Sequence, residues 1–178
     1  MSQNPFLAKS NLEYELPPFA EISEDDYLPA FYAGMEEQLA EVEEITSQAE
    51  VTFENTLVAL EASGGILSRV AAVFYNKSSS DTNEAIDKIE AEIAPKLAAH
   101  SDKIKLNQKL FARITKLVDS GLDLNSEDAW LLKRYHRDFF HAGAGLSDSQ
   151  REEIKRINEE LSTLQTEFSK RVLSETND

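Results

Sequence analysis

Apolar residues recur at steps of three and four along most of the chain, which is the spacing of one face of an α-helix. The first stripe spans residues 28–45, the second 53–74 and the third 86–104. Ser23 and Asp26 can cap the first helix, although Pro29 could mark a later start. No segment alternates with a period of two over several residues, so no β-sheet is expected. The pattern predicts an all-α, multi-helix fold.

Two of these stripes contain helix breakers. Gly64 and Gly65 interrupt the second stripe without shifting its phase, which fits either a kinked helix or two helices in near-register. Gly64 lies on the stripe itself, where a residue without Cβ permits close approach of a neighbouring backbone. Pro95 lies inside the third stripe, and we expect a kink or break near residues 92–94.

Shorter helices are expected further along. Asn107 can cap a helix that Gly121 stops, and Ser126 can cap another that ends at residues 142–145. Ser147 and Gln150 then form a capping box for a final helix without Gly or Pro. Its apolar seam must pack against something, since a lone helix of this length does not repay its ordering entropy. The seam comprises Ile154, Ile157, Leu161, Leu164, Phe168 and Val172.

Composition supports one helix-rich domain over residues 1–178. Only 6 Gly and 5 Pro occur among 178 residues, and we expect no membrane-spanning run. The net charge of -15 makes nucleic acid and anionic membranes poor partners. Residues 1–60 hold thirteen acids and one base, which indicates a solvated surface or, alternatively, an electrostatic docking face. The absence of Cys excludes disulfides and thiolate chemistry, and with no signal peptide visible we expect a cytoplasmic protein.

Searches for catalytic motifs return little. The chain has no His-Glu-x-x-His, no Gly-x-Ser-x-Gly and no phosphate-binding loop. His136 and His141 are five apart and so lie on different helix faces, while His100 is interpreted as a packed core residue. Asp138 and His141 match only half of a di-iron motif. Gly143-Ala144-Gly145 is interpreted as a helix stop. We therefore assign no catalytic, cofactor-binding or metal-binding residue.

Several short motifs nevertheless occur in one order along essentially the whole chain. They are Asn4-Pro5-Phe6, Leu16-Pro17-Pro18-Phe19, Leu28-Pro29-Ala30-Phe31, Thr52-Phe53-Glu54-Asn55-Thr56, Ser68-Arg69-Val70 to Phe74, Leu110-Phe111-Ala112-Arg113, and His136-Arg137-Asp138-Phe139 with Ala142-Gly143-Ala144. Together they resemble the N-terminal region of the thimet-type oligopeptidases, peptidase family M3, and most closely its bacterial peptidyl-dipeptidases. Val51, where Pro is usual, and Lys105, where an aromatic often stands, depart from the pattern.

The resemblance implies an all-helical domain of a zinc metallopeptidase. In that family a substrate channel runs between an N-terminal helical domain and a C-terminal domain with His-Glu-x-x-His, and the zinc ligands cannot be carried onto this sequence. The resemblance thus implies a channel wall, with the C-terminal catalytic domain as partner and oligopeptides as substrates of the parent enzyme. The chain alone is expected to be inactive. The alternative is a stand-alone helical interaction module that uses the last seam.

Overall fold

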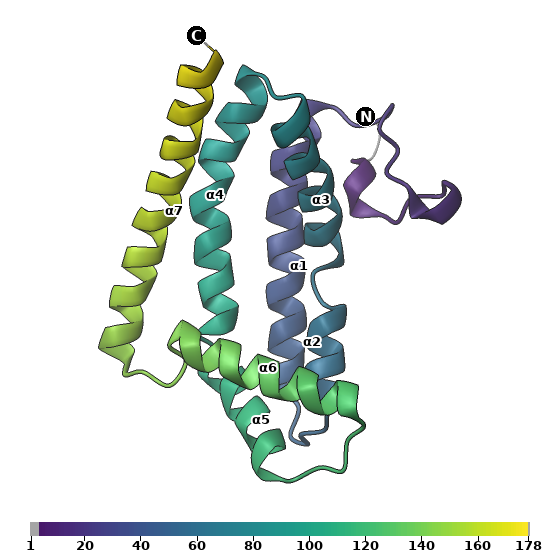
Figure 1. The fold of residues 1–178 in the computed structure, drawn as a ribbon. Coiled ribbons are helices and arrows are strands. Elements are labelled where there is room, and N and C mark those ends of the chain that lie inside the picture. The colour runs from purple at the N-terminus through teal and green to yellow at the C-terminus, as the bar shows by residue number, and fades with distance from the viewer. Residues whose placement is uncertain (1–3, 178) are drawn as a thin grey trace. The chain divides into compact units, whose positions relative to one another are not determined.

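The computed structural model describes residues 4–177, and this range is helical without any strand (Figure 1). The all-α prediction is confirmed. Short 3-10 turns at Pro5–Leu7, Glu13–Glu15 and Glu24–Asp26 precede the first long helix. The longer elements are α1 (Tyr27–Ser47), a π-helical turn (Glu54–Val58), α2 (Ala59–Ala62), α3 (Gly65–Ser80), α4 (Glu84–Lys105), α5 (Gln108–Asp119), α6 (Ser126–Ala142) and α7 (Asp148–Asn177).

The chain divides into two compact units. Unit 1 comprises Met1–Gln38, Gly64–Leu97 and Glu160–Asp178, and unit 2 comprises Leu39–Ser63 and Ala98–Glu159. Each unit has a buried hydrophobic cluster of its own.

Aromatic rings dominate the core of unit 1. Phe31 and Phe74 are fully buried and meet edge to face with ring centroids 5.4 Å apart. Tyr27 packs edge to face on Phe74 at 5.2 Å, and Phe6 lies 5.5 Å from Tyr27. Such pairs add about 0.5–1.5 kcal/mol each beyond the burial of their area. The N-terminal segment is therefore held against α1 and α3 by Phe6.

Within unit 1, α1 and α3 approach closely at Gly34. A Cβ at this position would lie 2.6 Å from the backbone nitrogen of Leu67 and 2.8 Å from its Cα. No side chain fits there without moving one helix. We expected such an approach at Gly64, but a Cβ at Gly64 would instead meet the side chain of Gln38.

Gly64 has a different role, which is to separate two helices. Ser63 is extended, and Gly64 has a φ of 75°, in the left-handed region that favours glycine. Helix α3 begins at the next residue. Of the two interpretations of this stripe, two helices is the one that the structure shows.

Pro95 does not break α4. The helix is continuous from Glu84 to Lys105, so of the predicted kink or break near residues 92–94 the break is wrong. Proline removes one backbone donor, but Ile89 and Ile93 before it are buried in the core of unit 1 and anchor the helix there. Pro29 lies in the first turn of α1, where a backbone N–H has no helical acceptor.

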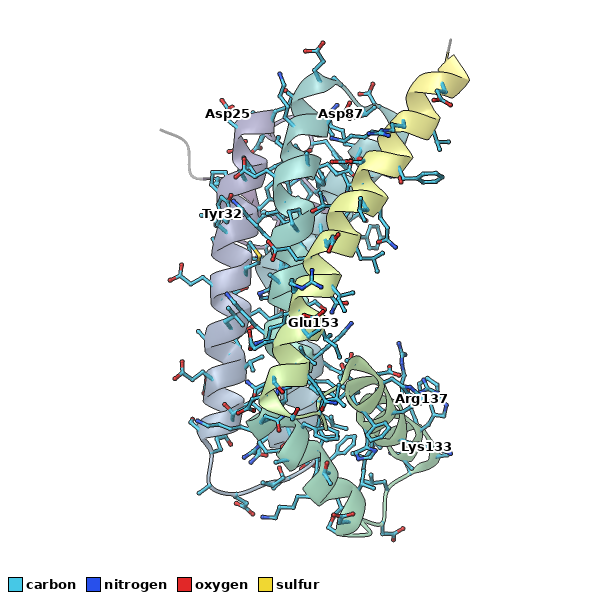
Figure 2. The ribbon with its side chains drawn as sticks, turned by 90° about the vertical axis from the view of Figure 1, so that its left-hand side faces the viewer. Asp25, Tyr32, Asp87, Lys133, Arg137 and Glu153 are labelled. Carbon is cyan, nitrogen blue, oxygen red and sulfur yellow. The ribbon has the colours of Figure 1, made fainter. Side chains whose placement is uncertain are left out.

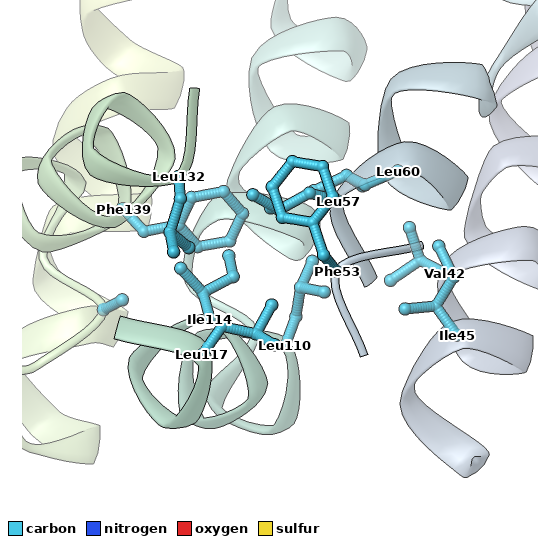
Figure 3. Packing of buried hydrophobic residues seen from close by; sticks show 11 residues of the cluster. Val42, Ile45, Phe53, Leu57, Leu60, Leu110, Ile114, Leu117, Leu132 and Phe139 are labelled. Carbon is cyan, nitrogen blue, oxygen red and sulfur yellow. The ribbon is translucent and has the colours of Figure 1, made fainter. Parts of the chain in front are cut away.

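The core of unit 2 gathers around the π-helical turn, α5 and α6 (Figure 3). Asn107 caps α5 as expected, its Oδ1 accepting from the Leu110 N–H at 3.0 Å. Asn125 rather than Ser126 caps α6, since the Asn125 Oδ1 accepts from two backbone N–H groups of the first turn. The fully or nearly buried members of this cluster are Val42, Ile45, Leu57, Leu110, Ile114, Leu117 and Ala144.

Helix α7 begins at the expected capping box but does not bury the expected seam. The Ser147 N–H and Oγ both bond Gln150 Oε1, at 3.1 and 2.8 Å. Of the six seam residues only Ile154 is half-buried, and the others are exposed by 46% to 69%. The cover that we expected this seam to need is therefore not supplied to these five residues by the part of the chain that the structure describes.

One stretch, Glu54–Ser80, has the length and composition of a membrane span, with a mean hydropathy of 1.6 in its most apolar window. This differs from the expectation that the chain has no membrane-spanning run. In the structure it is broken at Gly64, and residues such as Leu57 and Phe74 are buried in the cores of the two units. A core helix satisfies the same criterion, so this stretch is weak evidence for a membrane.

Candidate functional site

The most densely bonded polar cluster lies in unit 2 around Arg113. This side chain is only 6% exposed and points from α5 toward the segment before the π-helical turn. Its Nη1 donates to the Gln48 carbonyl at 2.6 Å, and its Nη2 donates to the Glu50 carbonyl at 2.8 Å and to Asn55 Oδ1 at 2.7 Å. Its Nε donates to Thr56 Oγ1 at 3.3 Å. Four neutral oxygens thus surround one buried cation.

The acceptors in this cluster are themselves fixed by the local backbone. Asn55 Oδ1 also accepts from the Thr52 N–H at 2.9 Å, and Thr52 Oγ1 accepts from the Asn55 N–H at 3.1 Å. These reciprocal bonds form a cap that holds the Asn55 side chain in the position where it accepts from Arg113. Burial lowers the pKa of the Arg113 guanidinium, which stays charged because its ordinary pKa is so high.

The Arg113 cluster connects two of the motifs that carry the resemblance to the M3 family, Thr52 to Thr56 and Leu110 to Arg113. Its bonds close a loop onto α5, and within residues 4–177 the acceptors bonded to Arg113 are carbonyl, amide and hydroxyl oxygens. We interpret the Arg113 cluster as a scaffold. Sequence reasoning missed this role, although one signal was present: Arg113 lies among Leu110, Ile114 and Leu117 on the apolar face of α5.

The N-terminal motif is anchored in the same manner within unit 1. Asn4 Nδ2 donates to the Asp26 carbonyl at 2.8 Å, while Asn4 Oδ1 accepts from the Phe6 N–H at 3.0 Å. Arg69 Nε donates to the Phe6 carbonyl at 3.2 Å. The Asn4-Pro5-Phe6 motif and Arg69 therefore tie the first residues to α3.

The three histidines lie in separate environments. His100 is 5% exposed, and burial together with the nearby Lys103 lowers its pKa. His136 stacks on Phe111 with ring centroids 5.5 Å apart, and His141 meets Phe140 edge to face. Within residues 4–177 no three His, Asp or Glu side chains gather as a metal site. The described residues thus do not fit the zinc ion that the family resemblance implies.

Asp138, which with His141 matches half of a di-iron motif in the sequence, belongs to a cluster of ion pairs on the surface of α6. Arg137 and Arg134 contact its carboxylate at 3.1 and 3.5 Å, and they lower its pKa. Lys133 and Arg137 point from the exposed face of the same helix (Figure 2). Gly143 then ends α6 with a φ of 103°, as the helix-stop interpretation expects.

Unit 2 also has a surface hollow of about 570 Å³ beside α6. Tyr135 and Glu61 bond across it, the Tyr135 hydroxyl donating to Glu61 Oε1 at 2.5 Å, and burial and this carboxylate raise the pKa of Tyr135. Arg134 is engaged with Asp138 at its rim. Two pairs of polar groups around this hollow, Tyr135 with Glu61 and Arg134 with Asp138, thus bond one another.

Comparison with known proteins shows that the homologues of this chain are peptidases of the M3 family, and the match is consistent with the N-terminal region of such a peptidase. It is 37% identical over 177 residues to dipeptidyl carboxypeptidase of Salmonella typhimurium, and 35% identical over 176 residues to that of Escherichia coli. Oligopeptidase A of Escherichia coli is 25% identical over 176 residues. These matches cover 97–98% of this chain.

The chain spans only about a quarter of the length of these relatives, 26% for both dipeptidyl carboxypeptidases and 25% for oligopeptidase A. No family model matches the chain.

Proposed function

We propose that this chain is the N-terminal helical domain of a zinc-dependent oligopeptidase or peptidyl-dipeptidase, and that it forms part of the wall of the substrate channel. The observation that carries this proposal is the match of nearly the whole chain to a quarter of dipeptidyl carboxypeptidase. In this proposal the parent enzyme hydrolyses short peptides in the cytoplasm, and a separate catalytic domain is the partner of this one.

The roles of the motif residues support a structural part in that enzyme. Arg113, Asn55 and Arg69 all make contacts that fasten one segment of the chain to another. The described residues offer no metal cluster, and the sequence has no His-Glu-x-x-His. The zinc and the residues that activate water in the proposed enzyme therefore belong to its other part, and this chain on its own is inactive.

A domain exchange tests the proposal. In the chimera, this chain replaces the segment of Salmonella dipeptidyl carboxypeptidase that it matches. A functional replacement restores zinc-dependent release of dipeptides from a short peptide, at a rate within about tenfold of the parent, or about 1.4 kcal/mol of activation free energy. A folded, zinc-loaded chimera without this activity would contradict the proposal.

A further inference from the structure

Helix α7 carries an apolar stripe that its own unit leaves in solvent. Leu161, Leu164 and Phe168 in unit 1 are exposed by 48%, 55% and 69%, and we call these three residues the α7 stripe. Their spacing of three and four places them on one face across two helical turns. Single exposed apolar side chains are ordinary, but a contiguous row on one helix marks an interaction surface.

If α7 packed only against its own unit, its apolar face would be expected to face that unit and its polar face to face solvent. The side that faces its own unit is polar: Ser162, Thr166 and Lys170 recur at steps of four and are half-buried. Lys170 Nζ donates to the Asp87 carbonyl of α4. Ser162 follows Leu161 by one residue, which is a rotation of about 100° around the helix, so these two side chains lie on different faces.

The figures agree with this arrangement. The C-terminal half of α7 lies beside the N-terminal half of α4, near Asp87 (Figures 1 and 2). Side chains along the other side of α7 project away from α4 (Figure 2). The polar face of α7 thus contacts unit 1, while its apolar face stays exposed to solvent. This apolar face can therefore bind another surface.

We propose that the α7 stripe is the docking surface for the remainder of an M3 peptidase polypeptide, the three quarters of its relatives to which this chain has no counterpart. This inference rests on the proposed function. An apolar row two turns long fits a groove between helices, which accepts residues at i, i+3 and i+7. We expect the docking partner to present such an apolar groove.

Charge argues against a second copy of this chain as the occupant. Unit 1 holds 17 acidic and 7 basic residues, a net charge of -10. Two such units brought together along α7 would repel each other. A surface from the rest of the peptidase need not carry this negative charge, so the same repulsion does not apply to it.

Hydroxyl-radical footprinting of the isolated chain and of the chimera described above tests the inference. We expect Leu161, Leu164 and Phe168 to be oxidised readily in the isolated chain and severalfold more slowly in the chimera, since docking removes them from solvent. Oxidation of the exposed Tyr14 on another segment is the internal reference. The readout does not require activity, so an inactive chimera with a protected stripe overturns only the proposed function.

Two outcomes would overturn the docking inference itself. Equal oxidation of the stripe in a folded chimera means that nothing covers it, whether or not that chimera hydrolyses peptides. Dimerisation of the isolated chain in sedimentation, abolished by Phe168→Glu but not by Ser169→Glu, means that a second copy is the occupant. Ser169 is exposed and adjacent in sequence but lies outside the stripe, so it controls for the added charge. Escherichia coli dipeptidyl carboxypeptidase provides a second host if the first chimera does not fold.

Discussion

Arg113 is a buried cation whose guanidinium is bonded by neutral oxygens alone. The planar fork reaches acceptors in different directions, which a lysine ammonium on a flexible stem cannot reproduce. The side chain thereby fixes the segment that includes residues 48–56 to α5. At this scale sequence reasoning recovered the caps at Asn107 and Ser147, because capping depends on residues three positions apart. The Arg113 cluster joins residues more than fifty positions apart, and no local pattern contains that pairing.

We predict that Arg113→Lys lowers the free energy of unfolding by about 2–3 kcal/mol, since several buried acceptors lose their donors. Urea denaturation followed by circular dichroism measures the change. The matched control is Lys116→Met, an exposed position on the same helix, which should alter stability by less than about 0.5 kcal/mol. Equal small effects of both substitutions would mean that the cluster does not hold the loop.

We predict that His100 makes the free energy of unfolding depend on pH below about 6.5. Burial, and then Lys103, lower its pKa below the ordinary value of about 6.5. Below that pH the unfolded chain binds a proton that the folded chain does not, so stability falls as the pH falls from about 6.5 toward the folded pKa. His100→Gln should reduce this slope in urea titrations from pH 8 to pH 5. An unchanged slope relative to wild type would contradict the stated role.

The long helices follow from the spacing of apolar residues. Whether a Pro or Gly breaks such a helix depends on its surroundings and on its backbone conformation in the fold. Pro95 is accommodated because buried residues before it hold α4 in place, and Gly64 ends one helix and precedes another because of its positive φ. The stripe of α7 was recognised in the sequence, while its orientation was not. Periodicity shows that a helix has an apolar face, but it does not show which neighbour that face meets.

Gly34 tests the close approach of α1 and α3. Alanine in a helix interior is normally favoured over glycine by about 1 kcal/mol, yet here its Cβ would overlap the backbone of Leu67. We predict a net loss of about 1–2 kcal/mol for Gly34→Ala, since the helices must separate. Gly65→Ala is the control, because its nearest neighbour is the flexible end of Arg69 at 3.5 Å, and it should be neutral or stabilising. Thermal unfolding of both variants distinguishes these results.

The exposure of the α7 stripe predicts that the isolated domain does not depend on it. Phe168→Glu should change the unfolding free energy by less than about 0.5 kcal/mol. Phe74→Ala, which removes a fully buried ring from the same unit, should cost about 3–5 kcal/mol. If Phe168→Glu were as destabilising as Phe74→Ala, the stripe would be part of the core of the domain.

For the whole molecule, the fold class and the family followed from the sequence, because helical periodicity and the ordered motifs extend over its whole length. The hydrolytic chemistry could not be located in it, since no catalytic motif is present and the described residues form no metal site. The motif residues Arg113, Asn55 and Arg69 instead shape and fasten helices. Together with the α7 stripe, these contacts support our proposal that the chain is a supporting part of a larger peptidase.

The most direct test of whether this chain lacks hydrolytic activity on its own is a peptide hydrolysis assay on the purified 178-residue chain. The assay contains zinc and a short peptide from which a C-terminal dipeptide can be released. We expect no hydrolysis above a blank without protein from a chain that circular dichroism confirms to be folded and helical. Zinc-dependent release of dipeptides by this chain alone, abolished by a chelator and restored by zinc, would contradict it.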